Sequence, residues 1–433
     1  MWVRVVLILC GMWLVGCSFG RPADVQSTAL PITATVPTIT ETVEPTVTTI
    51  PTLTVTPAPV DTTIRVRIVA ADRNSYAPVI DIIERAAQTI DLDVAVDIRS
   101  PDGTLVLQQG YLANDRIDVW IASAADTWQL GRVGAISSAP ITTDVPSYPF
   151  VAQLNRDMVV GGIAPIAAHN YFISIYNTEI LSSVPTTTNQ VQSMPGLLLR
   201  PRYRMAFPWA EGRWFDAMMQ AVQATSVISD GVQSIDADAA TSAMQTLVDL
   251  RTLGPRDATS YIESTTDFLN SRVPYTIDGD AALRRYAVLS DTLLLDYALP
   301  PVLSVSDTLW LPPIDMVYAV LPANIDGDRR AQVLLLIQQL QRRDAQNYLY
   351  EEMRWIPIRN DVLSAKSDDR LAAVLDQVGQ LADAQVYDDA TICRWDSYEQ
   401  VLPFALLKIW RIPVAVEALQ KQVETCPASS ALP

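Results

Sequence analysis

The chain has 433 residues, and 49% of them are apolar, so it can build packed cores and is not a disordered scaffold throughout. Its formal net charge of −17, with lysine only at Lys366, Lys408 and Lys421, disfavours nucleic acid and anionic lipid headgroups as partners. A single histidine, His169, and the lack of a Gly-x-x-x-x-Gly-Lys loop argue against a zinc enzyme and a nucleotide-binding loop. We therefore expect no metal, no cofactor and no nucleic acid.

The N-terminal segment predicts export. A short basic start precedes the apolar run Val5–Val15, which falls short of the about 20 residues that a transmembrane helix needs. Leu14-Val15-Gly16-Cys17 resembles the lipobox of bacterial lipoproteins, which implies cleavage before Cys17 and acylation of its thiol. Residues 1–16 are then a signal peptide, and the mature protein is held by lipid to the outer face of the cytoplasmic membrane. The alternative is an ordinary signal peptide with a chance cysteine.

Residues 17–62 are rich in Thr, Pro and Val. Proline recurs too often for a helix or a sheet ladder, so we expect an extended tether with a rise of about 3 Å per residue. No later apolar run reaches transmembrane length, and we expect the body that follows to be soluble and to touch the membrane through the lipid anchor only.

Structure is predicted to begin at Ile64–Ala70, where apolar residues alternate and then run together as in a buried strand. A polar turn leads to a helix with apolar residues at helical spacing from Val79 to Ile90. Leu92–Ile98 is a second alternating strand, a short helix follows Asp102, and Ile117–Ala122 is a third strand. This alternation predicts an α/β fold with a parallel sheet and right-handed crossovers.

Later segments resemble a known family. Ala124–Leu130 with Gly134-Ala-Ile136, and Met158–Asn177, are similar to the first lobe of extracellular solute-binding proteins, in particular the maltodextrin-binding type that serves ABC importers. The likeness continues in order to the C-terminus, through 236–250, 268–279, 310–320, 331–352, 355–358 and 398–419. It rests on the ordered series, because no single motif in it is specific.

The resemblance implies a two-lobed fold of the periplasmic-binding-protein type, each lobe a mainly parallel sheet flanked by helices, with several hinge crossings between the lobes. Lobe 1 would hold residues 63–168 and 308–354, and lobe 2 residues 170–305 and 358–430. Ser271 and Pro274 stand where the family has Gly and Ala, and Asp280 and Ala281 where an aromatic often follows Gly279. These departures weaken a maltodextrin assignment more than they weaken the fold.

By the same resemblance the chain is a membrane-tethered monomer that captures a small solute, expected to be a carbohydrate, in an interlobe cleft and delivers it to an ABC permease. It would not be an enzyme. One alternative is a surface or sensor module that keeps the fold without a ligand. Another is a cell-surface glycoside hydrolase using carboxylates such as Asp126 and Glu211, although nothing in the sequence pairs them.

Candidate ligand residues of the first lobe follow strands or lie at the first crossing. Sugar hydroxyls need acceptors such as Asp and Asn, and the apolar face of a sugar packs on Trp or Tyr. The candidates are Asp72 and Arg73 after the first strand, Asp126 and Trp128 after the third, and His169 and Asn170 at the crossing. The alternative for Asp72 and Arg73 is a surface turn. For Asp126 and Trp128 it is an N-cap with a packed aromatic, and for His169 it is a structural histidine.

In the second lobe the candidates are aromatic. Trp214 precedes a helix predicted over 215–224, where the family often has a stacking ring, and Trp310 opens the returning strand. Tyr398 matches a position that often stacks on sugar, with Trp395 one helical turn away. Core packing is the alternative for these rings.

Two smaller patterns complete the analysis. Cys393 and Cys426 remain after Cys10 leaves with the signal and Cys17 takes lipid, and an even pair in an oxidising compartment predicts a disulfide, with two buried thiols as the alternative. Asp-Gly-Asp at 278–280 and at 326–328 lacks the calcium-loop continuation, so both are expected to be turns.

Overall fold

The computed structural model describes residues 62–70, 76–100, 116–142, 144–157, 161–195, 203–222, 227–229, 232–255, 261–289, 294–383 and 388–427. The signal peptide, Cys17, the tether up to residue 61, the helix expected after Asp102, and the candidates Asp72 and Arg73 lie outside these ranges. The chain from Val60 onward is one compact unit. Within the described ranges, no helix is at once long and apolar enough to cross a membrane.

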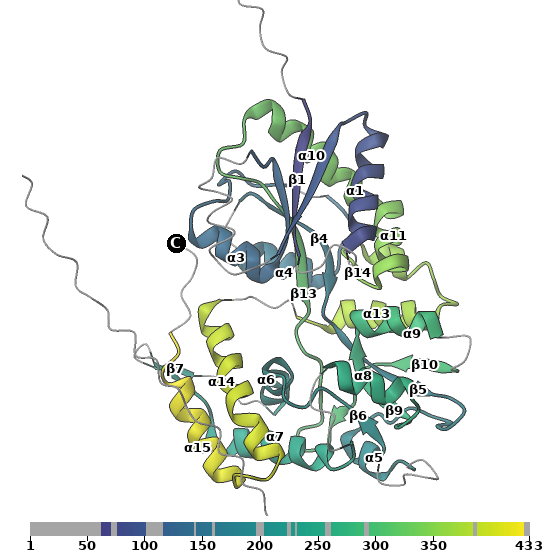
Figure 1. Cartoon of the computed structure of the whole chain (residues 1–433), viewed down its shortest axis with the longest axis vertical. Coiled ribbons are helices and arrows are strands. Elements are labelled where there is room, and N and C mark those ends of the chain that lie inside the picture. Colours follow the sequence, from purple (N-terminus) through teal and green to yellow (C-terminus); the bar gives the residue numbers. More distant parts are fainter. Residues whose placement is uncertain are drawn as a thin grey trace, which may run out of the picture. The chain divides into compact units, whose positions relative to one another are not determined.

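Six strands form the first sheet, in the order β14-β4-β13-β3-β1-β2 (Figure 1). β1 pairs in parallel with β2 and β3, and these are the three N-terminal strands that the sequence predicts. β13 is antiparallel to β3 and β4, and β14 is antiparallel to β4. The strands are β1 (Ile64–Val69), β2 (Val94–Arg99), β3 (Val119–Ser123), β4 (Ile163–His169), β13 (Asp315–Val320) and β14 (Ile356–Pro357).

Helices α1 (Ala77–Thr89), α10 (Gly327–Leu340) and α11 (Arg343–Met353) share one hydrophobic core with this sheet. α1 buries Val79, Ile82, Ile83, Ala86 and Ala87, because apolar residues three and four apart fall on one helical face. α3 (Ala124–Arg132) lies against β3 and β13, and α4 (Pro149–Asp157) contacts α13 (Arg370–Leu381).

The second sheet has the order β10-β5-β9-β6. Its strands are β5 (Phe172–Asn177), β6 (Met205–Ala206), β9 (Tyr275–Gly279) and β10 (Leu295–Ala298). Helices α6, α7, α14 and α15 pack together and share a core with this sheet that is rich in aromatic residues. The helices of this half are α5 (Thr188–Ser193), α6 (Gly212–Ala221), α7 (Ala237–Arg251), α8 (Tyr261–Leu269), α9 (Asp280–Leu289), α14 (Asp389–Leu406) and α15 (Ile412–Val423).

Short elements fill the connections. Two hairpins are formed by β7 (Val227–Ser229) with β8 (Val232–Ser234) and by β11 (Val302–Leu303) with β12 (Thr308–Leu309). α12 (Asn360–Leu363) precedes α13, and α13 contacts β14 and α4 on one side and β10 on the other. Residues 370–381 therefore pack on both sheets, whereas the predicted boundary assigns them to the second lobe alone.

The sheets are mixed rather than mainly parallel. In the first sheet only the β2-β1-β3 edge is parallel, and in the second only β6 with β9. The reason lies in the crossings, since β13 and β14 return from the second half of the molecule and enter the first sheet against the direction of β3 and β4. The α/β class, the two sheets and the flanking helices agree with the sequence, and the strand direction does not.

Two local predictions turn out as follows. Cys393 and Cys426 are joined by a disulfide with their Cα atoms 5.6 Å apart, which ties the first turns of α14 to the chain just past α15. Asp326 is the N-cap of α10, where its side chain accepts the Arg329 N–H at 2.8 Å, so 326–328 is a helix start and not the expected turn.

Candidate functional site

The side chain of Tyr76 marks the place where charged residues of both sheets come close together. Burial, together with the negative charges of Asp280, Asp315 and Asp126, raises the pKa of Tyr76 to about 12, while Arg284 acts in the opposite direction. Tyr76 is the N-cap of α1, and Asp126 lies in the first turn of α3. Three carboxylates from separate chain segments thus act electrostatically on one phenol, at the end of the sheet where ligands gather in α/β folds.

Asp126 is held by the way α3 begins. Strand β3 passes directly into the helix, and Ser123 is its N-cap. The Ser123 hydroxyl donates to Asp126 Oδ2 at 2.7 Å and accepts the Asp126 N–H at 3.2 Å. Burial, together with the charge of Asp315, raises the pKa of Asp126, and the serine bonds oppose this shift. The carboxylate is both a helix cap partner and a member of the acidic group.

Asn170 links the two sheets at the first crossing. Its φ of 53° is left-handed, a region that asparagine enters more readily than most residues. Its backbone N–H donates to Asp280 Oδ1 at 3.0 Å, and its Nδ2 donates to Asp315 Oδ2 at 3.3 Å. One residue therefore connects the start of α9 in the second half to the start of β13 in the first.

His169 lies beside the same carboxylate. Its Nε2 is 3.5 Å from Asp315 Oδ2, and its ring centroid is 5.6 Å from that of Trp355. The imidazole is 12% exposed, and Nε2 has no hydrogen-bond partner among the described residues. The histidine and asparagine that the sequence placed at the crossing are thus found together with Asp126 and Asp315.

Arg213 holds two crossings together from the second half. Its Nη2 donates to the carbonyl oxygen of Asn170 and, at 2.7 Å, to that of Pro313. Its guanidinium also lies 5.3 Å from the centre of the Phe172 ring. Next to it, Glu211 has its pKa raised to about 7 by burial and by Glu399, against the pull of Arg213. The segment before α6 therefore carries an acid that titrates near neutral pH.

The aromatic candidates of the second lobe are in the core. Trp214, Trp310 and Tyr398 are almost completely buried. The rings of Trp214 and Trp310 are 5.3 Å apart, and Tyr398 packs on Phe215 at 5.1 Å. In this conformation they offer no free face to a ligand, so the packing alternative fits them and the stacking prediction does not.

Two further tryptophans differ from these. Trp395 is half-buried on α14 beside the start of α6, where its carbonyl approaches Gly212 closely. Trp128 on α3 is 6% exposed, and its Nε1 has no hydrogen-bond partner in the described part of the chain.

Sequence reasoning missed Tyr76, Asp280 and Asp315. The Asp-Gly-Asp at 278–280 is not a turn, because Gly279 ends β9 and Asp280 starts α9. The available signal was its position, since an acid directly after a buried strand and before a helix lies at a strand's carboxyl end. Asp315 had a comparable signal, because it is the first residue of strand β13 and follows shortly after a pair of prolines.

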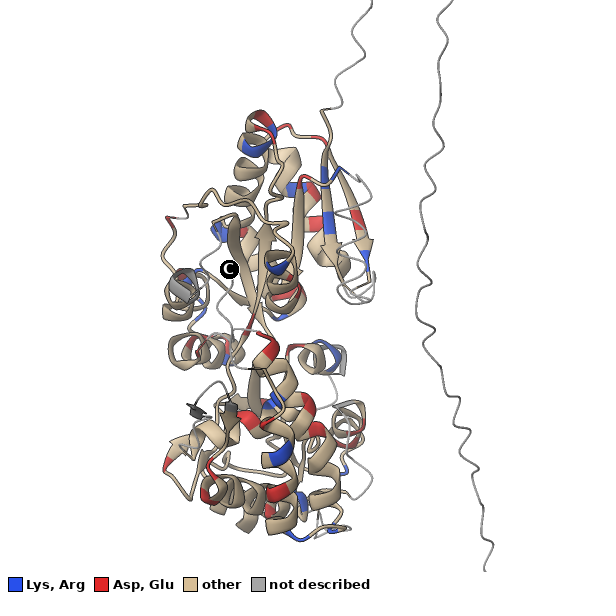
Figure 2. Cartoon of the chain, turned by 90° about the vertical axis from the view of Figure 1, so that its left-hand side faces the viewer, with Lys and Arg blue, Asp and Glu red and all other residues tan. Residues whose placement is uncertain are grey.

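The site is rich in acceptors, and among the described residues Arg284 is the cation that opposes the three carboxylates at Tyr76. Such a set can accept hydrogen bonds from hydroxyl or ammonium groups. In the described residues, no cluster of three or more His, Cys, Asp or Glu is placed to hold a metal ion. Over the molecule as a whole, acidic and basic residues are spread over both sheets and their helices (Figure 2).

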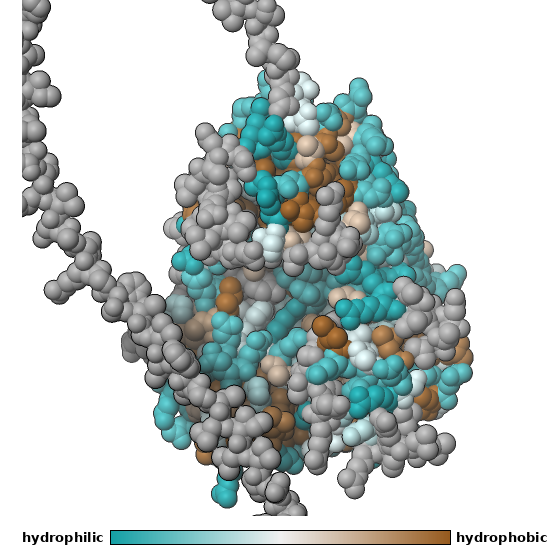
Figure 3. All heavy atoms as spheres, in the orientation of Figure 1, coloured by the Kyte–Doolittle hydropathy of each residue, from teal (hydrophilic) through white to brown (hydrophobic). Residues whose placement is uncertain are grey.

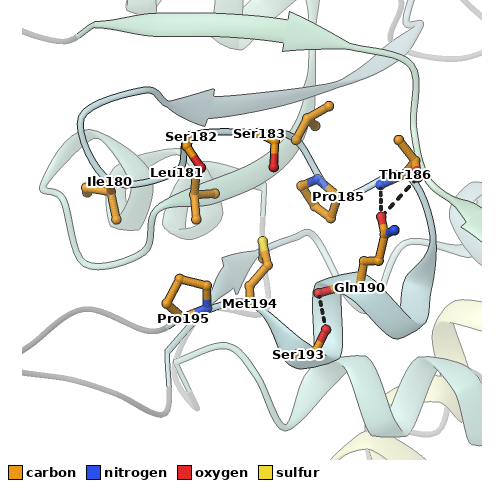
Figure 4. A pocket seen from close by; sticks show the side chains of 11 residues that line it. Ile180, Leu181, Ser182, Ser183, Pro185, Thr186, Gln190, Ser193, Met194 and Pro195 are labelled. Atoms are coloured by element: carbon orange, nitrogen blue, oxygen red, sulfur yellow. Dashed lines mark hydrogen bonds between the residues drawn. The ribbon is translucent and has the colours of Figure 1, made fainter.

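A separate hollow of about 340 Å³ lies between α5 and the preceding loop (Figure 4). Its lining has no charged side chain, and its polar groups bond to one another. Gln190 Oε1 accepts from Thr186 N at 2.7 Å and from Thr186 Oγ1 at 2.9 Å. It shares no residue with the acidic group, and we do not assign it a ligand.

Comparisons with known proteins support the fold. No family model matches the chain, and no curated protein matches it in sequence. Among solved structures it is similar to a cyclo/maltodextrin-binding protein complexed with maltotetraose, with a TM-score of 0.68 and 14% identity over 83% of this chain and 96% of the other. At this identity the likeness establishes a solute-binding-protein fold, and it is to a binding protein rather than an enzyme.

Proposed function

We propose that this chain is a solute-binding protein and that its solute is a carbohydrate, bound beside Tyr76 where the crossings meet. The observation that carries the proposal is the group formed by Asp126, Asn170, Asp280 and Asp315, which brings acceptors from both sheets around one phenol. It is supported by a fold similar to that of a protein complexed with maltotetraose.

The chemistry suits a polyhydroxylated solute. Carboxylates take paired hydroxyls as donors, and the Asn170 amide adds a donor and an acceptor. The half-buried ring of Tyr76, which packs 5.8 Å from the buried ring of Trp355, offers an apolar face. Because the acids come from both halves, a solute bridging them would favour closure about the crossings by hinge motion.

The delivery part of the proposal rests on the sequence. Cleavage before Cys17 and acylation of its thiol would anchor the protein to the outer face of the cytoplasmic membrane, and residues 17–62 would serve as the tether. The protein would act as a monomer and pass its solute to an ABC permease. Mass spectrometry of the mature N-terminus tests the anchor, and an unmodified start at another residue would contradict it.

The binding proposal is tested by a thermal-shift screen of the mature protein with mono- and oligosaccharides. A ligand that binds only the folded state at 100 times its Kd adds about 2.7 kcal/mol of stability, which is easily measured. Stabilisation by a sugar is expected. No shift with any sugar, amino acid or polyamine in a folded sample would contradict solute binding and favour a ligand-free surface module.

A cationic solute such as a polyamine is the second candidate. It is favoured by the three carboxylates at Tyr76, against which Arg284 acts among the described residues. Ammonium groups form charge-assisted hydrogen bonds with carboxylates, and cations also stack on aromatic faces. Stabilisation by polyamines but not by sugars in the same screen would select this candidate and keep the solute-binding role.

A further inference from the structure

The turn that joins α14 to α15 exposes an unusual number of large apolar side chains. We call residues 404–414 the apolar turn. Phe404, Leu407, Ile409 and Val414 are exposed by 38%, 55%, 62% and 50%. The turn lies at the lower end of α14 and α15 in Figure 1, and Figure 3 shows apolar residues reaching the surface in this part of the view. Contiguous exposed apolar residues mark surfaces that meet a protein or a membrane.

The apolar turn is held rigidly in its outward position. The rings of Phe404 and Trp410 are stacked with centroids 4.4 Å apart. The Phe404 carbonyl oxygen accepts the N–H groups of Ile409 at 2.9 Å and of Trp410 at 3.0 Å. On the inner side, Val401 and Ala405 of α14 and Val416 of α15 are buried in the core. The exposed side chains therefore cannot turn inward without breaking this packing.

The charge of the apolar turn is opposite to that of the chain. The net charge is −17, yet no acidic residue occurs from Gln400 to Val416. Lys408 and Arg411 are both exposed there, and neither has an ion pair within the described part of the chain. A cationic, apolar surface with a tryptophan at its edge is complementary to anionic headgroups above an acyl layer.

We propose that the apolar turn docks into the surface of a membrane that contains anionic lipids. Leu407, Ile409 and Val414 would enter the boundary of the acyl chains, Trp410 would lie at the headgroup level, and the two cations would meet lipid phosphates. The acidic remainder of the chain is repelled by the same lipids, so docking would also orient the domain.

The inference rests on the proposed lipid tether only for the local concentration of the apolar turn near the membrane. A small apolar surface with two cations binds lipid weakly by itself, and stable attachment generally takes two signals. A tether keeps the turn at high local concentration near the membrane, so that a weak contact is populated. It does not depend on which solute is bound.

The test places an environment-sensitive fluorophore on the full chain at Ile409→Cys, and at Leu335→Cys as a control. Leu335 is 49% exposed on α10 and lies in an ordinary polar setting. The labelled chains, with the unsubstituted chain as background, are mixed with vesicles of phosphatidylcholine and phosphatidylglycerol whose acyl chains are brominated. We expect the emission at position 409 to move to shorter wavelength and to be quenched, and that at position 335 to stay as in water.

Replacing the cations sharpens the test. Lys408→Gln and Arg411→Gln in the Ile409→Cys chain should lower the ratio of docked to undocked turn by roughly five-fold for each cation. Equal quenching at both positions, or none at 409, would overturn the proposal. A spectral change at 409 that needs no vesicles and grows with protein concentration would overturn it in favour of contact between copies. Sugar binding is measured separately, and its result does not change how the fluorescence outcomes are interpreted.

Discussion

Asn170 combines a left-handed backbone with hydrogen bonds to groups of both sheets. Its amide N–H and side chain reach Asp280 and Asp315, and its carbonyl oxygen accepts from Arg213. The backbone N–H, the backbone carbonyl and the side-chain Nδ2 of this residue are thus used in joining the halves. Its position in the sequence was predictable from the resemblance, whereas these partners, 43 to 145 residues away, were not.

Substitution at Asn170 separates backbone strain from side-chain bonding. Asn170→Ala loses the Nδ2 bond and places in the left-handed region a residue that enters it less readily than asparagine, which costs about 1 to 2 kcal/mol. Asn170→Gly loses the same bond without that strain. Urea unfolding should therefore find the alanine variant less stable than the glycine variant by about 1 kcal/mol. Equal stability, or a less stable glycine variant, would contradict the left-handed conformation.

Glu211 gives the protein a specific pH dependence. Its folded pKa of about 7 lies above the ordinary value of 4.5, so the folded state holds a proton that the unfolded state has already lost. Stability is therefore lost as pH rises from 4.5 to 7, by an amount on the order of 3 kcal/mol. The charges that face it are Arg213, which lowers the pKa, and Glu399 and Asp278, which raise it.

Glu211→Gln should remove this loss, because glutamine stays neutral. Denaturant unfolding at several pH values should show the variant gaining on the unsubstituted protein between about pH 5 and 7.5. Parallel profiles for the two proteins would mean that Glu211 titrates normally.

At the scale of elements, the contact between α6 and α14 leaves no room for a side chain. A Cβ on Gly212 would lie 2.4 Å from the carbonyl oxygen of Trp395, which is a backbone atom and cannot turn aside. Gly212→Ala should push the helices apart and destabilise the fold by about 1 to 3 kcal/mol. Gly327 is the matched control, since it also opens a helix but has nothing within 4 Å of its Cβ.

Gly327→Ala should be neutral or slightly stabilising, because alanine is the better helix former. Chemical unfolding of both variants distinguishes local crowding from a general intolerance of substitution at helix starts. If both lose the same stability, the close approach of α6 and α14 is not the cause.

The disulfide fixes the end of the C-terminal helix pair. It closes a loop with a sequence separation of 33 residues, for which chain entropy predicts about 3 to 4 kcal/mol of stabilisation. Cys393→Ser with Cys426→Ser should lower the free energy of unfolding by up to this amount. A thiol titration of denatured, unreduced protein should find no reactive Cys393 or Cys426, and two free thiols there would contradict the bridge.

On the scale of the whole molecule, the sequence predicted the α/β class, the order of the elements and the first crossing. Those predictions rested on periodicity, as in α1, whose five buried residues follow from spacing alone. Strand direction was not predictable in the same way. The apolar sequence pattern of β13 is compatible with a parallel or an antiparallel strand, and its partners β3 and β4 come from far earlier in the chain.

The site was predictable in part. His169 and Asn170 contact Asp315, which the sequence had not singled out. The charge of Asp315 also acts on Asp126. That these candidates bind a ligand stays a prediction. Trp214, Trp310 and Tyr398 were chosen for being aromatic, but aromatic residues also fill cores, and composition cannot separate the two roles. Tyr76 and Asp280 were missed because their importance arises only when separate segments meet.

The central claim is that the acidic group at Tyr76 binds a carbohydrate. The most direct test is a calorimetric titration with the sugar found by screening, carried out on the unsubstituted protein and on an Asp315→Asn variant. Asp315 is 4% exposed and asparagine keeps its shape, so the fold should persist while one charged acceptor is lost. Affinity should fall about ten-fold or more. Asp344→Asn, whose side chain is 78% exposed on α11, should bind as before. No carbohydrate binding by the folded protein, or unchanged affinity in Asp315→Asn, would contradict the claim.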